Sequence, residues 1–487
     1  MVKLKTLGAN PLSIKANLPV HGLPRNHYNC SPNLPSAYPS LSLTNSQQSQ
    51  HPIFLYPPVN QSVAAIVFGD GSESRLYPLT KRRSEAAIPI AANYRLIDAV
   101  VSNCINSNIN KIYALTQVNS TSLNSHLSRA YSGARLGQEG FVEVIAAYQS
   151  PEHQSWFQGT ADAIRRCLWL LEEYPVNEFL VLPGQHLYKM DYQKLIEAHR
   201  NSKSDITIVA LSSMRDHDPG FGLLKVNSEY QVMEFSMKSD RESIQLKEVQ
   251  NSRRSIDNSY STHPSMGIYL INRDTMEKLL NEVYPKANDF GSEVIQGAVS
   301  TGMKVQAKLF DGYWEDFRNI EAFYQANMEC IEKSHMGYNS FYDRDSPVYC
   351  MPRRLPPTLI SGAVVTDSVI GDGCILNSCK IKGSVVGMRT RIGDGAIVED
   401  SVIMGYDIYK EEDIRGVEEK GGIPLGIGEN AQIRKAIIDK NARIGRNVMI
   451  INRDNVQEGD REAEGYIISG GIVVVLRSAE IPHGSIL

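Results

Sequence analysis

The chain has 487 residues, a formal net charge of −4 and 21% charged residues. This length leaves room for two or three domains with sizeable cores, and the charge balance excludes a dedicated nucleic-acid surface, which needs clustered basic residues. No apolar run reaches the ~18 residues that a membrane-spanning helix requires, so no membrane segment is expected.

The N-terminal segment is distinguished by its charge. The first 69 residues contain no aspartate or glutamate and are rich in serine, proline and asparagine. This composition is typical of an organelle transit peptide that runs into a linker, although a plain disordered tail has the same composition. We assign residues 1–61 to a transit peptide and linker.

A glycine-rich turn follows the first apolar run. Residues 63–68 predict a short buried strand, and Gly69, Gly71 and Arg75 come directly after it. Strands that end in such a turn hold phosphates in α/β folds, because glycines let backbone N–H groups approach the anion and arginine adds charge. By itself the signal is weak, since Gly-x-Gly is more often an ordinary turn.

Apolar strands and helical patterns alternate from residue 62 to about residue 324. This alternation predicts an α/β domain over residues 62–335 with a Rossmann-like, mostly parallel sheet, whose ligands lie at the carboxyl ends of the strands. A polar stretch without periodicity, residues 239–264, predicts a surface loop. The expected strands are 63–68, 111–116, 179–182 and 205–211, and the expected helices are 162–173 and 192–200.

The periodicity changes beyond residue 360. Aliphatic residues, often followed by glycine, recur every five or six residues, as in Ile370-Gly371 and Ile444-Gly445. After a linker at residues 336–360, this hexapeptide pattern predicts a left-handed parallel β-helix over residues 361–487 with its aliphatic side chains inside. Many hexapeptide proteins are acyltransferases, but His483 is the only histidine after residue 335. We therefore interpret the β-helix as a packing and regulatory domain.

The seven cysteines are scattered through the chain, and none belongs to a Cys-x-x-Cys pair. A zinc site or a disulfide scaffold is therefore not expected, and reduced thiols are the default.

Several longer motifs carry a family resemblance. They cover residues 75–81, 156–163, 265–269, 288–295 and 437–445. On these motifs the chain from about Ser62 onward resembles the sugar nucleotidyltransferases, and among them the plant ADP-glucose pyrophosphorylase small subunits. The resemblance implies synthesis of ADP-glucose and pyrophosphate from glucose 1-phosphate and ATP with Mg²⁺, in starch synthesis in the plastid stroma. The expected partner is a large subunit in a heterotetramer, or a further copy of this chain.

The catalytic metal site departs from the family pattern. The implied reaction is an in-line attack of the sugar phosphate on the α-phosphorus of ATP, in which positioning, charge neutralisation and Mg²⁺ supply most of the catalysis. The family holds the metal with two aspartates, because Mg²⁺ prefers anionic oxygen. The aligned residues here are Gln185 and Asp316, and Arg318 replaces a family glycine. A neutral amide in place of one carboxylate makes Mg²⁺ binding through Asp316 alone doubtful.

The phosphate-binding loop departs as well. Arg75 is retained, but Asp70 and Glu73 replace two family glycines and Glu85 replaces a lysine. One like charge at about 4 Å costs about 4 kcal/mol at an effective dielectric constant near 20, which would slow the reaction by roughly three orders of magnitude if felt in full.

The sugar-phosphate side is better retained. By the resemblance, Lys238 contacts the phosphate of glucose 1-phosphate and Glu293 contacts the sugar, and Ser265 and Gly159 are also kept. Met237 replaces an acidic residue. We therefore expect the chain to retain binding of a sugar phosphate even where it has lost catalysis.

The β-helix carries the implied regulatory site. Lys440 and Arg443 align with family residues at the site for the activator 3-phosphoglycerate, whereas without the resemblance Lys440 is a solvated turn lysine. The family also has a cysteine that joins subunits by a disulfide. Phe54 aligns approximately with it, so this redox switch is expected to be absent.

Some retained residues have simpler interpretations when taken alone. Asp162 is then only a favourable charge in a first helical turn. Trp156 and Trp314 are core residues, and Arg75 and Lys238 are solvated cations.

Three functions remain open from the sequence. The favoured one is an inactive or severely impaired small subunit that modulates a heterotetramer, because the departures concentrate in catalytic motifs while scaffold motifs persist. The second is a weakly active ADP-glucose pyrophosphorylase or another sugar-1-phosphate nucleotidyltransferase. The third is a non-enzymatic interaction protein that uses the β-helix.

Overall fold

The computed structural model describes residues 56–69, 75–131, 136–147, 156–171, 173–213, 220–237, 260–331, 339–351, 353–408 and 422–487. Most of the predicted transit segment and of the predicted loop lies outside these residues, as do Phe54, Asp70, Glu73 and Lys238. The described residues belong to one unit, Tyr56–Leu487. None of the helices described is long and apolar enough to cross a membrane.

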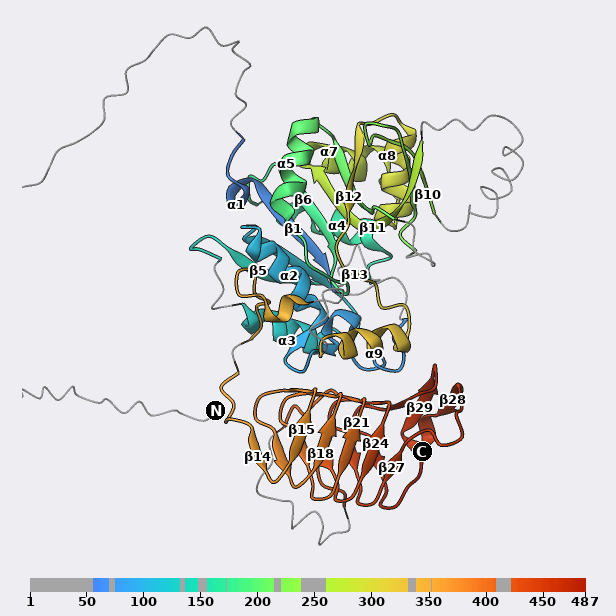
Figure 1. The fold of residues 1–487 in the computed structure, drawn as a ribbon. Coiled ribbons are helices and arrows are strands. Elements are labelled where there is room, and N and C mark those ends of the chain that lie inside the picture. The colour runs from blue at the N-terminus through green and yellow to red at the C-terminus, as the bar shows by residue number, and fades with distance from the viewer. Residues whose placement is uncertain are drawn as a thin grey trace, which may run out of the picture. The chain divides into compact units, whose positions relative to one another are not determined.

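A nine-stranded sheet organises the first part of the chain (Figure 1). Its strands are β1 (Val63–Phe68), β4 (Lys111–Thr116), β5 (Phe141–Ala146), β6 (Glu178–Pro183), β8 (Ile206–Leu211), β9 (Leu223–Val226), β10 (Val232–Ser236), β11 (Ser261–Asn272) and β12 (Val305–Phe310). Neighbours follow the order β10-β9-β11-β6-β1-β4-β5, and β8 pairs with both β11 and β12. Pairing is parallel through β6, β1, β4 and β5 and between β8 and β12. This confirms the predicted Rossmann-like, mostly parallel sheet.

The long strand β11 is one of the strands of the sheet that were not predicted from the sequence; the others are β5, β9, β10 and β12. It runs antiparallel to β6, β8 and β9. Its first residues, Ser261 to Pro264, pair with β9, so the predicted surface loop is wrong at its C-terminal end.

The central strands are buried on both faces. In β1, Ala64 and Ile66 pack into one hydrophobic cluster, while Val63, Ala65 and Val67 pack into a second. This division follows from the alternation of side chains along a strand. It explains why the strand is a continuous apolar run, which is typical of strands covered on both sides.

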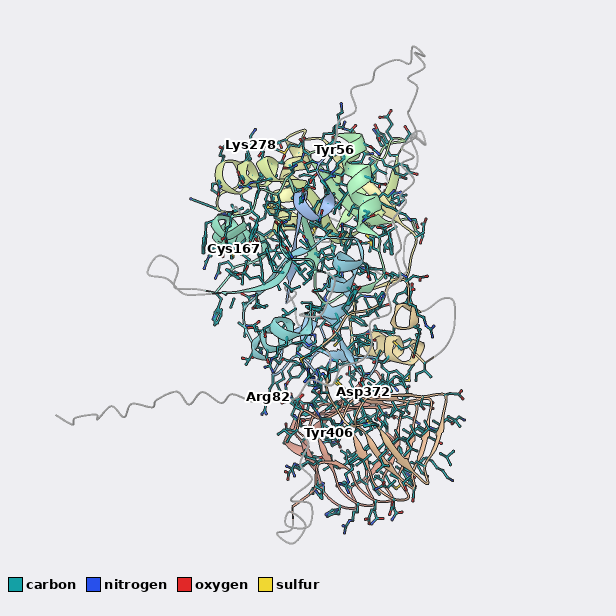
Figure 2. All side chains as sticks on the ribbon, turned by 90° about the vertical axis from the view of Figure 1, so that its left-hand side faces the viewer. Tyr56, Arg82, Cys167, Lys278, Asp372 and Tyr406 are labelled. Atoms are coloured by element: carbon teal, nitrogen blue, oxygen red, sulfur yellow. The ribbon has the colours of Figure 1, made fainter. Side chains whose placement is uncertain are left out.

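Helices cover the sheet and connect its strands. They are α1 (Val59–Ser62), α2 (Leu96–Asn106), α3 (Thr121–Ala130), α4 (Thr160–Leu171), α5 (Tyr192–Ser202), α7 (Arg273–Lys278), α8 (Gln296–Ser300) and α9 (Ile320–Glu329). Asp191 caps the start of α5 by accepting the Gln193 N–H at 3.0 Å, which satisfies one of the unpaired donors at a helix start. Cys167 of α4, labelled in Figure 2, is a buried free thiol.

The C-terminal part is a β-helix of three parallel sheets (Figure 1). One sheet contains β14 (Leu359–Ser361), β17 (Ile375–Asn377), β20 (Arg391–Ile392), β23 (Gly426–Ile427), β26 (Arg443–Ile444) and β31 (Glu480–Ile481). The second contains β15 (Val364–Thr366), β18 (Lys380–Lys382), β21 (Ile397–Glu399), β24 (Gln432–Arg434) and β27 (Met449–Ile450). The third contains β16 (Val369–Ile370), β19 (Val385–Val386), β22 (Val402–Ile403), β25 (Ala436–Ile438) and β30 (Ile472–Val475), and β29 (Tyr466–Ser469) and β28 (Glu458–Arg461) add an antiparallel hairpin to it.

The interior of the β-helix is aliphatic, as the hexapeptide pattern predicts. Buried isoleucine, valine and alanine side chains from all three sheets form its core, together with Cys374 and Cys379. The hydroxyl of Tyr406, labelled in Figure 2, donates to the carbonyl of Ala442 at 2.8 Å. Strand β14 begins at Leu359, inside the segment that the sequence analysis assigned to a linker. All six cysteines within the described residues are free.

The β-helix packs against the segment that follows the glycine-rich turn and against α9. Leu79 and Phe323 share a hydrophobic cluster with Val385, Ile437 and Val474 of the β-helix. The two parts therefore share a core, which ties the β-helix to the loop that carries Arg75.

Candidate functional site

A cavity of about 690 Å³ opens at the carboxyl ends of two neighbouring parallel strands. Phe68 and Pro183, the last residues of β1 and β6, line it. This is the edge at which ligands bind in open α/β sheets. The sequence pattern predicts a ligand site at this edge of the sheet.

A small antiparallel ladder brings the two metal-site positions to one wall of the cavity. Strand β7 (Leu187–Tyr188) pairs with β13 (Trp314–Glu315). Gln185 lies just before β7 and Asp316 just after β13. Antiparallel pairing places the start of one strand beside the end of the other, so both side chains line the cavity.

The carboxylate of Asp316 is engaged by two arginines. The residue is 3% exposed. The Nε of Arg318 donates to Oδ1 at 3.2 Å, and Nη1 of Arg75 lies 3.8 Å from Oδ2. Both guanidinium groups line the cavity. The one acidic residue left from the family's metal pair is thus already neutralised from within the chain.

The amide of Gln185 and the imidazole of His186 lie beside this group. Gln185 is 7% exposed, and its Oε1 has no hydrogen-bond partner within the described residues. His186 is fully buried, packs edge-on against Phe221 and Trp314, and has no partner there for either ring nitrogen. Burial, together with the Arg75 charge, lowers the pKa of His186 to about 3. The ring is therefore neutral at physiological pH.

These residues do not fit a magnesium ion. Mg²⁺ is normally held by one or two carboxylates, whereas this wall offers one carboxylate and a neutral amide. An ion on Asp316 would also face two guanidinium groups, and each pair of unit like charges at about 4 Å costs about 4 kcal/mol at an effective dielectric constant near 20. The donor set and its charges both disagree with the family's metal.

A further carboxylate projects toward the cavity from the loop after β1. Glu85 opens the short 3₁₀ helix Glu85–Ala87, is 6% exposed and lines the cavity. The following residues, Ala86 and Ala87, are buried in one of the two hydrophobic clusters that pack against the sheet. The charge reversal noted in the sequence therefore faces the ligand space and not the solvent.

The sugar-phosphate residues of the sequence analysis divide into two groups. Met237 lines the cavity. Glu293 is exposed, is not among the lining residues, and accepts the backbone N–H groups of Asn288 and Asp289 at 3.1 and 2.9 Å. Its side chain organises the backbone of that turn, and its sugar contact stays a prediction.

Ser265 and Gly159 also shape the backbone around the cavity, the first by a hydrogen bond and the second by its lack of a side chain. The hydroxyl oxygen of the fully buried Ser265 accepts the N–H of Gly267 at 3.1 Å. A Cβ at position 159 would lie 2.4 Å from the carbonyl oxygen of Asn288. Glycine is therefore required where the start of α4 crosses this turn.

A second polar part of the cavity wall was not predicted from the sequence. Asp289 and Ser292 line the cavity. One oxygen of Asp289 accepts the Ser292 N–H at 2.7 Å, and the other accepts the Thr160 hydroxyl at 3.1 Å. The motif at residues 288–295 was recognised, and an aspartate that caps a helical turn inside it was the signal that could have identified this wall.

The predicted regulatory residues lie in the β-helix, away from this cavity. Lys440 is 6% exposed and its Nζ pairs with Oδ1 of Asp407 at 2.5 Å. Arg477 Nη2 lies 3.2 Å from the other oxygen. Burial lowers the pKa of Lys440 to about 8 although Asp407 opposes this shift. Lys440 is therefore not a solvated turn lysine. Arg443 donates to the Ile423 carbonyl at 2.5 Å.

The purely structural roles predicted for single retained residues are confirmed for some of them and wrong for one. Trp314 is fully buried as expected, but Trp156 is 48% exposed, so its assignment to the core is wrong. Asp162 lies in the first turn of α4 and pairs with Arg166 at 3.0 Å. His483 Nδ1 accepts the Arg446 N–H at 2.7 Å, which is a structural role.

Comparison with known proteins agrees with this architecture. A nucleotidyl transferase model matches residues 64–333, and a GLGC left-handed parallel β-helix model matches residues 353–486. The chain is 63% identical over 452 residues, 92% of each chain, to the inactive glucose-1-phosphate adenylyltransferase small subunit 2, chloroplastic, of Arabidopsis thaliana. It is 52% identical over 461 residues to the chloroplastic/amyloplastic glucose-1-phosphate adenylyltransferase small subunit of Triticum aestivum, which covers 93% of this chain and 97% of that protein.

Proposed function

Because the chain belongs to the family of glucose-1-phosphate adenylyltransferase small subunits, which are also called ADP-glucose pyrophosphorylase small subunits, we propose that it is a plastid subunit that catalyses adenylyl transfer at a severely reduced rate or not at all. Both relatives carry a plastid location in their names, and the predicted plastid localisation agrees with them. One of these relatives is named inactive.

The observation that carries the proposal is the state of Asp316. Its carboxylate lies between the guanidinium groups of Arg318 and Arg75, and the second metal position is the neutral Gln185. Adenylyl transfer in this family needs a divalent metal ion that neutralises the phosphates as the bond to the leaving group breaks. This wall of the cavity does not provide a site for that ion.

The retained scaffold supports a modulatory role in an assembly. Buried side chains form both the hydrophobic core of the β-helix and the cluster that it shares with α9. We extend the proposal to assembly with a large subunit in a heterotetramer. A free large subunit would then gain a partner without gaining a second active site.

The test is the formation of ADP-glucose by the full chain co-expressed with a large subunit whose own active site has been disabled. The assay is run with Mg²⁺, with and without 3-phosphoglycerate. Co-purification without turnover supports the proposal. Turnover near that of an ordinary small subunit contradicts inactivity, and failure to co-purify contradicts the heterotetramer and favours an interaction role of the β-helix alone.

A further inference from the structure

We propose that Arg318 takes the place of the divalent cation in the cavity, so that the cavity excludes metal and binds a sugar phosphate without it. The choice of ligand class rests on the proposed function, because only the family membership points to a sugar phosphate. The role of Arg318 rests on the geometry around Asp316.

Arg318 contacts Asp316 through one nitrogen of its guanidinium group. Its Nε donates a hydrogen bond to Oδ1 of Asp316 at 3.2 Å. Its Nη1 and Nη2 make no hydrogen bond within the described residues. The side chain is 28% exposed and lines the cavity. A guanidinium has five N–H donors in a fixed plane, so four of them are available to an anion. This fork matches the geometry of a phosphate group.

The backbone holds Arg318 in this position. Phe317 has a φ of 43°, which is the left-handed region, although it is bulky and fully buried. Such a conformation is costly and persists only where the surroundings enforce it, and here the ring packs edge-on against Phe323 at 5.8 Å. The turn lets Arg318 fold back onto the carboxylate that precedes Phe317. The cation is therefore positioned by the fold and not by a ligand.

Neutral polar groups beside Arg318 can also bind the ligand. The Oε1 of Gln185 is buried and has no partner within the described residues. The same side chain carries two N–H donors, so it can meet a hydroxyl with its oxygen and a phosphate with its nitrogen. Asp289 and Ser292 also line the cavity. The Ser292 hydroxyl donates to Asp289 at 2.8 Å, so the two side chains offer acceptor oxygens to the hydroxyls of a sugar.

The net charge of the wall selects the size of the anion. Asp316, Arg75 and Arg318 together carry one positive charge, whereas Glu85 and Asp289 each add a negative charge elsewhere in the cavity lining. The single positive charge of the Asp316 group suits one phosphate monoester placed against it. A triphosphate needs more neutralisation and would meet Glu85, so the cavity is expected to favour glucose 1-phosphate over ATP.

The first experiment measures glucose 1-phosphate binding to the full chain by titration calorimetry, once in EDTA and once with Mg²⁺. We expect binding in EDTA that Mg²⁺ does not strengthen. Arg318→Gln should weaken it by about tenfold, because one charge-assisted hydrogen-bonding group is lost, and Arg318→Lys should fall between the two because it keeps the charge. Arg434→Gln, at an exposed position of β24, is the matched control and should bind like the unchanged chain.

Three results of this experiment would overturn the proposal: binding that requires Mg²⁺, no binding in either buffer, or equal binding by Arg318→Gln. Thermal unfolding of each variant separates a loss of binding from a loss of fold. ATP in EDTA is titrated alongside, and binding tighter than that of glucose 1-phosphate would contradict the charge argument.

The second experiment measures Mn²⁺ binding by electron paramagnetic resonance. We expect no bound Mn²⁺ in the unchanged chain or in Gln185→Asp, and bound Mn²⁺ in Gln185→Asp/Arg318→Gly. Mn²⁺ bound by either of the first two shows that Arg318 does not exclude the metal, and none bound by the double variant shows that Arg318 is not what excludes it. ADP-glucose formation is assayed separately: turnover together with glucose 1-phosphate binding in EDTA and no bound Mn²⁺ contradicts the proposed function alone, whereas Mg²⁺-dependent binding without turnover contradicts this inference alone.

Discussion

The guanidinium of Arg83 and the carboxylate of Asp439 form an ion pair that is buried on both sides. The two residues are 356 positions apart in the sequence. Arg83 follows the glycine-rich turn, and Asp439 ends a coil of the β-helix next to Lys440. The pair therefore joins the loop that borders the cavity to the coil that carries the predicted activator site.

Breaking this pair should destabilise the protein strongly. Arg83→Ala or Asp439→Ala leaves a buried charge without its partner, which costs about 3–5 kcal/mol. Urea unfolding of the full chain measures the loss. The control is Lys194→Ala, which removes an exposed contact at 3.9 Å from Asp191 and should cost less than about 1 kcal/mol. An equal decrease in the free energy of unfolding for the buried and the exposed pair would show that the buried ion pair does not stabilise the fold.

Lys440 should make stability depend on pH on the alkaline side. Its pKa is about 8 in the folded chain against 10.5 for the unperturbed side chain. Between these values the unfolded chain binds the proton more tightly, so the free energy of unfolding contributed by this group rises with pH from about 8 to 10.5 and is lost as the pH falls through 8. Its partner Asp407 has a lowered pKa and titrates on the acid side of its usual range, outside this window.

The comparison is between the unchanged chain and Lys440→Met, with the free energy of unfolding measured at steps from pH 7 to pH 10. The methionine variant keeps the buried stem but has no proton to lose. The difference in stability should move in favour of the unchanged chain as the pH rises. Parallel curves for the two proteins would contradict the assigned burial of the ammonium group.

Gly159 should tolerate no side chain. In Gly159→Ala the new Cβ would lie 2.4 Å from the carbonyl oxygen of Asn288, so the turn that carries Asp289 and Ser292 must move. Overpacking of this kind costs about 1–3 kcal/mol, and it should also weaken glucose 1-phosphate binding. Gly459→Ala is the matched control, because its Cβ would find no atom closer than 3.6 Å. Equal stability of the two variants would mean that the chain at Gly159 has room for a side chain against the backbone of Asn288.

The parts of the fold that the sequence predicted are those with a strong local period. The aliphatic repeat of the β-helix and the apolar run of β1 each carry their own signal, and both lie where it places them. The start of β11 carries no such signal, because Ser261 to Pro264 are held by pairing with β9 and not by their own preferences.

The site depended on contacts that no local pattern contains. Gln185 and Asp316 meet through a ladder of two-residue strands, which is too short to leave a period in the sequence. Lys440 finds its partner Asp407 on a different coil, 33 positions away. In the same way, the packing of Arg318 onto Asp316 depends on a left-handed turn at Phe317, a residue whose type gives no hint of that conformation.

Recovery of catalysis should require several changes at once. Gln185→Asp restores a second carboxylate but leaves Arg318 on Asp316, and Arg318→Gly frees Asp316 but leaves a single carboxylate. Glu85→Lys removes the anion that lines the cavity and supplies a cation for the phosphates. Because these residues face one cavity, their effects should be far from additive. We expect no ADP-glucose from any single variant and measurable turnover only when all three are combined.

The measurement is ADP-glucose formation with Mg²⁺, in complex with a large subunit that has been disabled. Each like charge removed from the phosphate side is worth about 4 kcal/mol at most at an effective dielectric constant near 20, and so roughly three orders of magnitude in rate at most. If the triple variant binds Mn²⁺ but stays inactive, the remaining cause of inactivity lies in the glycine-rich turn. Turnover by Gln185→Asp alone would show that the Arg318–Asp316 contact yields to the metal.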